Sequence, residues 1–282
     1  MWICRDHDPI AELVCPRASV LVPTMGALHE GHLALVRQAV EHADRHALAG
    51  GAVVWIFVNP TQFDEPSDFK RYARTLDDDV EQCRVCGASG VYAPAVRAVY
   101  PPDNPILVPQ LPDQAVGKGL EDAHRPRHFE GVCQVVRRMF DLVRPAAAVF
   151  GEKDWQQLQV VHAMSARDNL GVEILNGPTV REPDGLAMSS RNRFLVGPER
   201  EQGLALSRAL RAASDEPDPA SAESAMRRVY ADHAIDSPNY AAIRDAETLG
   251  PVVEGRPARA ITAARVGTVR LLDNAPWPLS QP

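Results

Sequence analysis

The sequence is poor in the features that mark several classes of protein. Its five cysteines are an odd number without the spacing of a disulfide framework, which argues against a secreted disulfide scaffold. No apolar run approaches the roughly 20 residues of a membrane span, and residues 1–6 lack signal-peptide features. Acidic residues outnumber lysine and arginine, 37 to 30, so a general binder of nucleic acid or of an anionic membrane is disfavoured. We therefore expect a cytoplasmic protein with small-molecule partners.

Familiar ligand signatures are absent as well. Neither a Walker A motif nor the glycine fingerprint of a dinucleotide site occurs in the chain. Cys83 and Cys86 have the spacing of a redox or zinc pair, but no second pair follows, and we interpret them as small core side chains. His29 and His32 are three residues apart, whereas the zinc-protease motif places its histidines four apart.

Apolar runs alternate with helical patterns in the first two thirds of the chain. The runs lie at residues 20–22, 53–58, 91–93, 146–150 and 172–175, and the helical patterns at 32–47, 75–86, 132–143 and 155–167. The runs are almost continuous, as in strands that are covered on both faces. This order predicts an α/β fold with a Rossmann-like, doubly wound parallel sheet.

The pattern changes after residue 178. Two helical patterns at residues 198–213 and 220–234 precede three short apolar runs at 239–244, 260–264 and 268–272. The last two runs face each other across a tight turn, which favours an antiparallel sheet. We expect a larger ligand-binding domain at residues 1–178 and a smaller α+β lid domain at residues 179–282.

The segment PTMGALHEGH, residues 23–32, joins an apolar run to a helical pattern. At such a junction the free N–H groups and the dipole of the helix favour an anion such as phosphate. His29 and His32 would share one face of that helix. An isolated histidine pair is more often a solvated surface feature, but the flanking glycines favour a nucleotide site.

Polar residues also follow two other runs. Asn59 and Gln62 come after residues 53–58, and Lys153 and Asp154 come after residues 146–150. Because ligands of doubly wound sheets bind beyond the carboxyl ends of the strands, these side chains are candidate ligand contacts. Residues 184–192 and 124–131 add a Ser-Ser-Arg loop and a basic loop. Taken singly, each of these segments could equally be an ordinary solvated turn.

Taken together, the motifs resemble the pantoate:β-alanine ligases, or pantothenate synthetases, of the nucleotidylyltransferase superfamily. The matching segments, in order, are residues 23–32, 56–63, 128–132, 150–158, 184–192 and 270–274. The resemblance implies ATP-dependent and Mg²⁺-dependent activation of pantoate as pantoyl adenylate, with release of pyrophosphate. The amine of β-alanine would then displace AMP to give pantothenate. The family also implies a homodimer.

The resemblance also implies roles for individual residues. Catalytic roles fall to His32, His29, Lys153, Ser189, Ser190 and Arg191. ATP contacts fall to Thr24, Met25, Gly26, His29, His32, Gly151, Glu152, Lys153, Asp154, Val180, Met188, Ser189, Ser190 and Arg191. Substrate contacts fall to Gln62, Gln157, Asn59 and Met25, and no metal ligand is assigned. A protonated His32 is expected as a proton donor, because bound phosphates favour the charged imidazole.

Some positions depart from the family pattern. Thr61 stands where the family commonly has methionine, and a shorter polar side chain would enlarge and wet the acid pocket. A pantoate analogue or a different amine therefore stays open, as do nucleotidyl transfer to another small acceptor and a catalytically silent nucleotide-binding protein.

Overall fold

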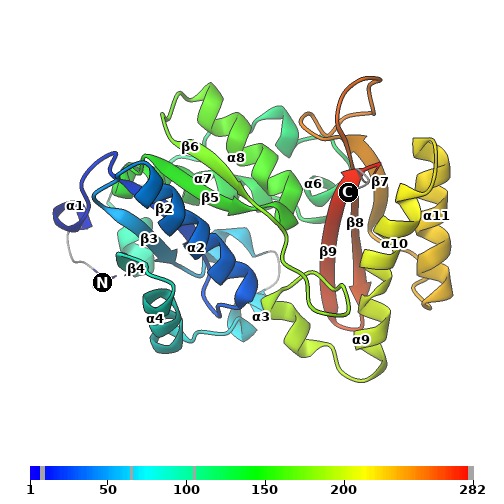
Figure 1. Ribbon diagram of the computed structural model, residues 1–282, viewed down its shortest axis with the longest axis horizontal. Coiled ribbons are helices and arrows are strands. Elements are labelled where there is room, and N and C mark those ends of the chain that lie inside the picture. Colours follow the sequence, from blue (N-terminus) through cyan, green and yellow to red (C-terminus); the bar gives the residue numbers. More distant parts are fainter. Residues whose placement is uncertain (7–9, 64–65, 104–105, 279–282) are drawn as a thin grey trace.

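The computed structural model describes residues 1–6, 10–63, 66–103 and 106–278, which form two sheets (Figure 1). The larger sheet has six parallel strands in the order β1-β4-β3-β2-β5-β6. In chain order they are β1 (Trp2–Asp6), β2 (Ser19–Thr24), β3 (Gly51–Ile56), β4 (Gly90–Pro94), β5 (Ala147–Gly151) and β6 (Glu173–Gly177). The predicted parallel α/β sheet is confirmed, but the edge strand β1 was not foreseen, because its short sequence mixes apolar and charged residues.

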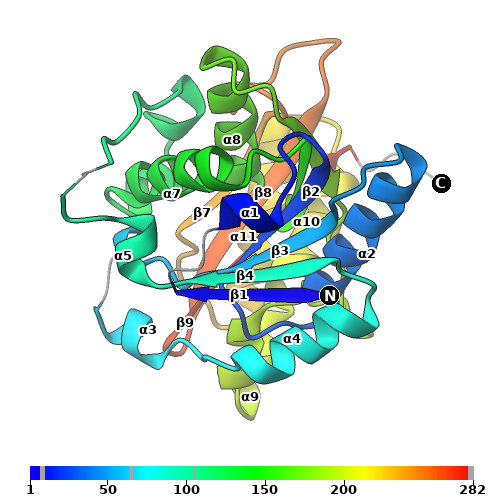
Figure 2. The same cartoon turned by 90° about the vertical axis from the view of Figure 1, so that its left-hand side faces the viewer.

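Helices cover both faces of this sheet. They are α1 (Ile10–Leu13), α2 (Glu30–Arg45), α3 (Pro66–Arg71), α4 (Leu76–Val85), α5 (Val96–Val99), α6 (Glu121–His124), α7 (His128–Val143) and α8 (Trp155–Arg167). Val20 and Val22 of β2 pack with α2 and α4, whereas Leu21 between them packs with α7 and α8. Figure 2 shows these two helix pairs on opposite sides of the strands. Burial on both faces explains the continuous apolar runs of the sequence.

The strand order reverses between β2 and β5. From β2 the chain builds outward through β3 and β4, and after β5 it builds the other way to β6. Loops at the carboxyl ends of β2 and β5 therefore separate from each other, and a ligand-binding crevice is expected between them. Short 3₁₀ helices follow two central strands, η1 (Pro60–Gln62) after β3 and η3 (Glu152–Asp154) after β5.

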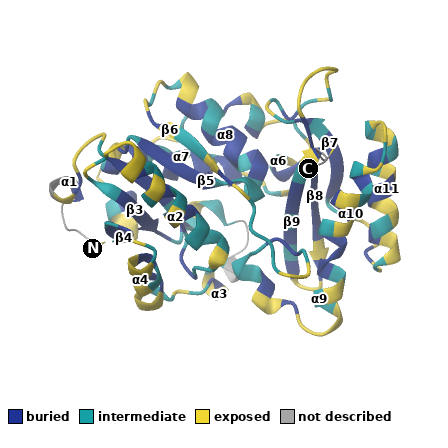
Figure 3. Ribbon diagram, viewed as in Figure 1, coloured by how far each residue is buried: buried dark blue, intermediate teal, exposed yellow. Residues whose placement is uncertain are grey.

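The second sheet is antiparallel, in the order β7-β8-β9. Its strands are β7 (Tyr240–Asp245), β8 (Ala258–Val266) and β9 (Val269–Trp277), and its helices are α9 (Pro198–Gly203), α10 (Ala205–Ser214) and α11 (Pro219–Asp232). One face packs on α10 and α11, while Tyr240, Ala242 and Ile261 join the hydrophobic cluster of α7 and α8. Figure 3 shows these strands mostly buried. Because the sheet shares that cluster, the domain boundary at residue 178 stays a prediction.

The two remaining 3₁₀ helices are η2 (Asp113–Ala115) and η4 (Ser190–Phe194). Within the described ranges, no helix combines the length and the apolar character that crossing a bilayer would demand.

A buried charge cluster ties the second sheet to α6. The Glu121 carboxylate accepts hydrogen bonds from the Tyr240 hydroxyl at 2.7 Å and from two Arg270 nitrogens at 2.5 and 2.9 Å. Burial alone would raise the pKa of Glu121, but the hydrogen bonds and charge of Arg270, with the charge of Arg125, lower it to about 2. Glu121 therefore stays ionised and holds β7 and β9 against the first sheet's helices.

Glu121→Ala is expected to lower the free energy of unfolding by about 3–5 kcal/mol, because it leaves Arg270 buried without its partner. Urea unfolding at neutral pH measures the change. The control is Glu41→Ala, which breaks the exposed Glu41–Arg45 pair on α2 and should cost less than about 0.5 kcal/mol. Equal losses in the two variants would contradict a structural role for the buried cluster.

Candidate active site

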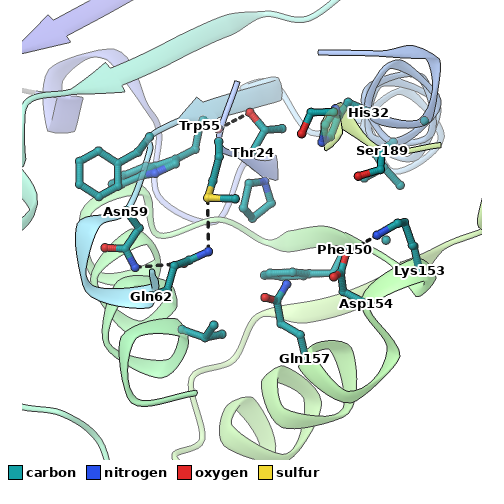
Figure 4. Close-up of a pocket in the computed structure, with 18 of the residues that line it drawn as sticks. Thr24, His32, Trp55, Asn59, Gln62, Phe150, Lys153, Asp154, Gln157 and Ser189 are labelled. Atoms are coloured by element: carbon teal, nitrogen blue, oxygen red, sulfur yellow. Dashed lines mark hydrogen bonds and ion pairs between the residues drawn. The ribbon is translucent and has the colours of Figure 1, made fainter. Parts of the chain in front are cut away.

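A cavity opens at the carboxyl ends of β2, β3 and β5, where the strand order reverses. Figure 4 shows Gln62 at one end of it and Lys153 and Ser189 at the other. The residues predicted for the site that line the cavity are Thr24, Met25, His29, His32, Asn59, Gln62, Gly151, Lys153, Asp154, Gln157, Val180, Met188, Ser189, Ser190 and Arg191. The structure thus brings together segments that are up to 167 positions apart, from Thr24 to Arg191.

Two predicted ATP contacts, Gly26 and Glu152, are not among the lining residues. Gly26 has a φ of +80°, a backbone conformation that glycine adopts without strain, and it turns the chain from β2 toward α2. The Glu152 carboxylate pairs instead with Arg259 of β8 at 3.0 Å. Both residues therefore shape the neighbouring loops.

Asp79 of α4 holds the β2–α2 turn. Its carboxylate accepts hydrogen bonds from the N–H groups of Ala27 at 3.0 Å and Leu28 at 2.8 Å, and from the Thr75 hydroxyl at 3.2 Å. The side chain is buried, so the turn is fixed from beneath by another helix. The sequence did not reveal this contact, because an acidic first helical turn at residues 77–79 is common on its own.

His29 and His32 lie side by side where α2 begins, with ring centroids 4.0 Å apart. Desolvation lowers the pKa of His29 to about 4, with a further lowering by Lys153. Desolvation also lowers the pKa of His32 to about 3, and His29 and Lys153 add to the effect. A neutral His32 imidazole is therefore favoured at neutral pH, and the protonated His32 expected from the sequence would need the negative charge of a bound phosphate.

The Nδ1 atoms of both histidines are buried without a hydrogen-bond partner in the part of the chain that the structure describes. Lys153 adds a cation at the same end of the cavity, with its Nζ 3.9 Å from an Asp154 carboxylate oxygen. Across the cavity the Tyr72 hydroxyl lies 3.3 Å from the Ser190 hydroxyl, and the Arg191 guanidinium lies 5.9 Å from the Tyr72 ring centre. These groups favour an anionic ligand.

Gln62 is held in a fixed orientation at the other end. Its Nε2 contacts the Met25 sulfur at 3.3 Å, and its Oε1 accepts a hydrogen bond from Asn59 at 3.0 Å. The remaining Asn59 acceptor receives the Tyr100 hydroxyl at 2.8 Å. Arg125 and His128 both reach the Gln62 carbonyl oxygen at 3.2 Å. The Gln62 amide is therefore preorganised before any ligand binds.

Gly131 has a packing role in the segment at residues 128–132, where α7 meets η1. A Cβ atom there would lie 2.6 Å from the Thr61 carbonyl oxygen, so only glycine lets α7 approach η1 this closely. The Gly131 carbonyl also accepts a hydrogen bond from Asn59 at 3.2 Å. This close approach seats the Gln62 loop on α7.

The structure places the Thr61 side chain outside the lining of the cavity. Its hydroxyl lies 3.0 Å from the Asn59 side-chain oxygen and 3.2 Å from the Tyr100 hydroxyl, and Thr61 does not line the cavity. A residue directly before Gln62 was expected to share its pocket, but the 3₁₀ turn directs the two side chains differently. The Thr61 hydroxyl therefore adds no polar group to the cavity lining, and its effect on substrate choice stays a prediction.

Sequence reasoning also missed several lining residues. Tyr72, Arg125, His128 and the apolar wall formed by Trp55, Phe57, Val132, Val135, Val136, Met139 and Phe150 all reach the cavity. His128 and Phe129 fall in a segment that was noted only as a motif. The apolar residues gave no signal because core packing alone accounts for them.

No cluster of three or more histidine, cysteine or acidic side chains suited to a metal ion occurs within the described ranges. Cys83 is buried, and desolvation raises its pKa to about 12, so its thiol stays protonated. Its assignment as a core side chain is confirmed, and Cys86 is partly buried beside it.

A cationic cavity at the switch point of a parallel sheet, with oriented amides at its far end, is typical of α/β enzymes that bind a phosphate-bearing ligand. The sequence pattern of the family described as pantoate-beta-alanine ligase matches residues 10–276. The chain belongs to this family, whose members are ATP-dependent ligases.

Individual relatives agree with this assignment. A pantothenate synthetase of Rubrobacter xylanophilus is 48% identical over 270 residues, which cover 92% of this chain and 90% of the relative. The crystal structure of the Thermus thermophilus enzyme matches with a TM-score of 0.86 and 39% identity, covering 98% and 99% of the two chains. A Francisella tularensis pantoate-beta-alanine ligase, complexed with beta-gamma ATP and beta-alanine, matches with a TM-score of 0.77, 27% identity and coverage of 98% and 97%.

The buried histidines should make the fold less stable in acid. Their ordinary pKa is 6.5, and it falls to about 3 in both His32 and His128. The unfolded chain therefore binds more protons below about pH 6.5, so stability falls as the pH drops from there toward 3. Each buried histidine should contribute a loss on the order of 2 kcal/mol between about pH 7 and pH 5. Urea unfolding should show that the free energy of unfolding depends less steeply on pH in His32→Asn than in the wild type. An equal pH dependence in the two proteins would contradict the lowered pKa of His32.

Proposed function

We propose that this chain condenses (R)-pantoate with β-alanine to pantothenate through pantoyl adenylate, consuming ATP and releasing AMP and pyrophosphate. The observation that carries the proposal is one cavity with two distinct ends. The oriented Gln62 amide faces one end, and histidines, a lysine and a Ser-Ser-Arg segment face the other. An acid and a nucleotide could meet between them.

The chemistry needs both ends. A carboxylate does not condense with an amine at neutral pH, so a pantoate oxygen attacks the α-phosphorus of ATP and the bond to pyrophosphate breaks. The β-alanine nitrogen then attacks the acyl carbon, and AMP leaves with the bonding electrons. The protein must stabilise the charge that develops on the phosphates, which is the task of preorganised donors.

The triphosphate would lie against the start of α2. We assign His29, His32, Lys153, Ser189, Ser190 and Arg191 to the phosphates, with His32 as the proton donor once phosphate raises its pKa. The N–H of Met25 would contact the nucleotide too. Gly151 would contact the ribose, Val180 would flank the adenine, and Met188 would close over the phosphates.

Pantoate would occupy the other end. It combines a carboxylate and two hydroxyls with an apolar dimethyl centre, which suits amides set against an apolar wall. Gln62 and Gln157 would bind its polar groups, and Met25 would pack on its carbon chain. Asn59 has protein partners on both atoms of its amide, so we assign it the orientation of Gln62 in place of direct substrate contact.

Magnesium fits this arrangement as a partner of the phosphates. Mg²⁺ is usually held by one or two carboxylates together with substrate phosphates. Asp154 is the only carboxylate among the described lining residues, and it is half-exposed beside Lys153. Asp154 would hold the ion, which would supply neutralising charge to the phosphates. A homodimer, a cytoplasmic location and closure of residues 179–282 as a lid belong to the same proposal.

The test is exchange of labelled pyrophosphate into ATP with Mg²⁺ and a panel of carboxylic acids, without any amine. Exchange should require pantoate, and Lys153→Ala should reduce the rate by roughly 100-fold to 1000-fold, because it removes a charge that stabilises the transition state. Unfolding curves of the variant should match the wild type. Near-wild-type exchange would remove Lys153 from the mechanism.

The other outcomes separate the alternatives. Exchange with another acid alone would keep adenylation but change the substrate. Normal pantoate-dependent exchange with no product from β-alanine would point to a different amine. Absence of exchange with every acid would favour nucleotidyl transfer to another acceptor or a silent nucleotide-binding protein.

Thr61→Met should leave the KM for pantoate within about twofold of the wild-type value, because Thr61 lies outside the cavity and a peripheral change costs little. The matched comparison is Gln62→Ala, which removes a lining amide and should raise that KM strongly. Steady-state kinetics with pantoate as the varied substrate measure both variants. A clear fall in KM for Thr61→Met would restore Thr61 as a specificity residue.

A further inference from the structure

Two consecutive residues of β9, Asp273 and Asn274, contact two different segments of the cavity wall. Both are buried, with exposed fractions of 1% and 2%. Asn274 contacts η3, which carries Lys153, and Asp273 contacts Arg181, which leads to the Ser189–Ser190–Arg191 segment. Neither residue lines the cavity itself.

Both polar atoms of the Asn274 side-chain amide form hydrogen bonds. Its Nδ2 donates to the carbonyl oxygens of Glu152 at 2.9 Å and Lys153 at 2.8 Å, and its Oδ1 accepts from Arg259 Nε at 2.5 Å. An aspartate would have the same shape but would present an oxygen to two carbonyl oxygens. The contact therefore depends on the two amide hydrogens.

Arg259 completes the bracing of η3. Its guanidinium donates to the Glu152 carboxylate at 3.0 Å and lies 3.4 Å above the ring centre of Trp155. Trp155 is the first residue of α8, and its indole N–H donates to the Ala246 carbonyl at 2.8 Å. Side chains of β8 and β9 thus contact Glu152, Lys153 and Trp155, on both sides of the Lys153 position.

Asp273 acts on the other segment. Its carboxylate accepts two hydrogen bonds from Arg181, at 2.6 and 3.0 Å. Arg181 also donates to the Gly185 carbonyl at 3.0 Å and forms a β-bridge with Ala187. The bridge closes a short loop, and the chain continues directly into Met188 and Ser189. The bidentate pair therefore fixes the base of the Ser-Ser-Arg segment.

We propose that Asp273 and Asn274 are positioning residues for adenylate formation, because they set the separation of Lys153 from the Ser189–Ser190–Arg191 segment. The inference rests on the proposed function, in which both groups hold one triphosphate. Neighbouring residues on one strand cannot move apart, so a single rigid element fixes both sides of the phosphate site. Gln62 lies on η1, outside these contacts, and the start of α8 that carries Gln157 is held separately by hydrogen bonds from Gln156 to Gln114 and Asp122, so pantoate binding should not depend on Asp273 or Asn274.

The test uses Asn274→Ala and Asn274→Asp in the full-length chain, with pantoate-dependent pyrophosphate exchange as the readout. A displacement of about 1 Å at a reacting group can cost about 100-fold in rate, so we expect kcat to fall about 10-fold to 100-fold in both variants. The KM for pantoate should stay within about twofold. Wild-type kcat in Asn274→Asp would show that the amide hydrogens are dispensable and would overturn the proposal.

A double-mutant cycle with Lys153→Ala separates positioning from general damage. If Asn274 acts through Lys153, Asn274→Ala should change the rate less than about threefold in the Lys153→Ala background. If Asn274→Ala and Lys153→Ala lower the exchange rate by independent factors that multiply in the double variant, the proposal is overturned. Asp273→Asn tests the other side, and it should lower kcat while leaving the KM for pantoate unchanged.

Ser165→Ala is the control for loss of stability. Ser165 is buried in α8, ten residues beyond Trp155, and its hydroxyl donates a hydrogen bond to the Val172 carbonyl at 3.2 Å. It should lower the unfolding midpoint without lowering kcat at a temperature well below unfolding. A fall in kcat equal to that of Asn274→Ala would mean that both effects are general, and it would overturn the positioning role.

Failure of the proposed function has a different signature. If the wild-type chain shows no exchange with pantoate, the same double-mutant cycle is repeated with a different readout. That readout is the dissociation constant of ATP, measured by calorimetry. Coupled losses of ATP affinity in Asn274→Ala and Lys153→Ala would keep the positioning role with another reaction. Independent losses would overturn it.

Discussion

The reversal of strand order between β2 and β5 is the constraint on which the site depends. It separates the loops after two adjacent buried strands and leaves the cavity between them. The β2–α2 turn brings histidines to one side, and η3 brings Lys153 to the other. Each loop then needs support from elsewhere, because a loop over a crevice has few neighbours of its own. Asp79 supplies it for the first loop and Asn274 for the second.

The second sheet therefore also supports the loops that form the cavity. Tyr240 and Arg270 anchor it to Glu121 by a charged cluster whose members satisfy one another, which is the condition under which buried ions are tolerated. Its other contacts reach the loops of the cavity through Arg259, Asp273 and Asn274. Arg125 extends the connection from Glu121 to the Gln62 carbonyl. Both ends of the cavity are thus linked to one antiparallel sheet, so its placement fixes their relative geometry.

The sequence predicted the elements whose signal is local. Continuous apolar runs located β2 to β6, and the turn residues around His29, Gln62 and Lys153 marked the strand ends where side chains converge. Contacts between distant segments left no such signal. Asp79 resembles an ordinary helix-start acid, Asn274 belongs to a motif without visible chemistry, and Thr61 points away from the cavity although its neighbour Gln62 points in. Each of these contacts depends on the direction in which a side chain points in the folded protein. Hydrophobic periodicity does not determine that direction.

The histidine pair shows why such support is needed. Two imidazoles 4.0 Å apart, with buried Nδ1 atoms that no described residue satisfies, are an arrangement that folding alone would not favour. Desolvation and Lys153 keep both rings neutral, which avoids the repulsion of adjacent cations. A polyphosphate bound as proposed would reverse that balance, because its charge favours protonation of the same rings. The site would then gain positive charge on binding its ligand, and the β2–α2 turn, which Asp79 holds, keeps the two rings adjacent in either state.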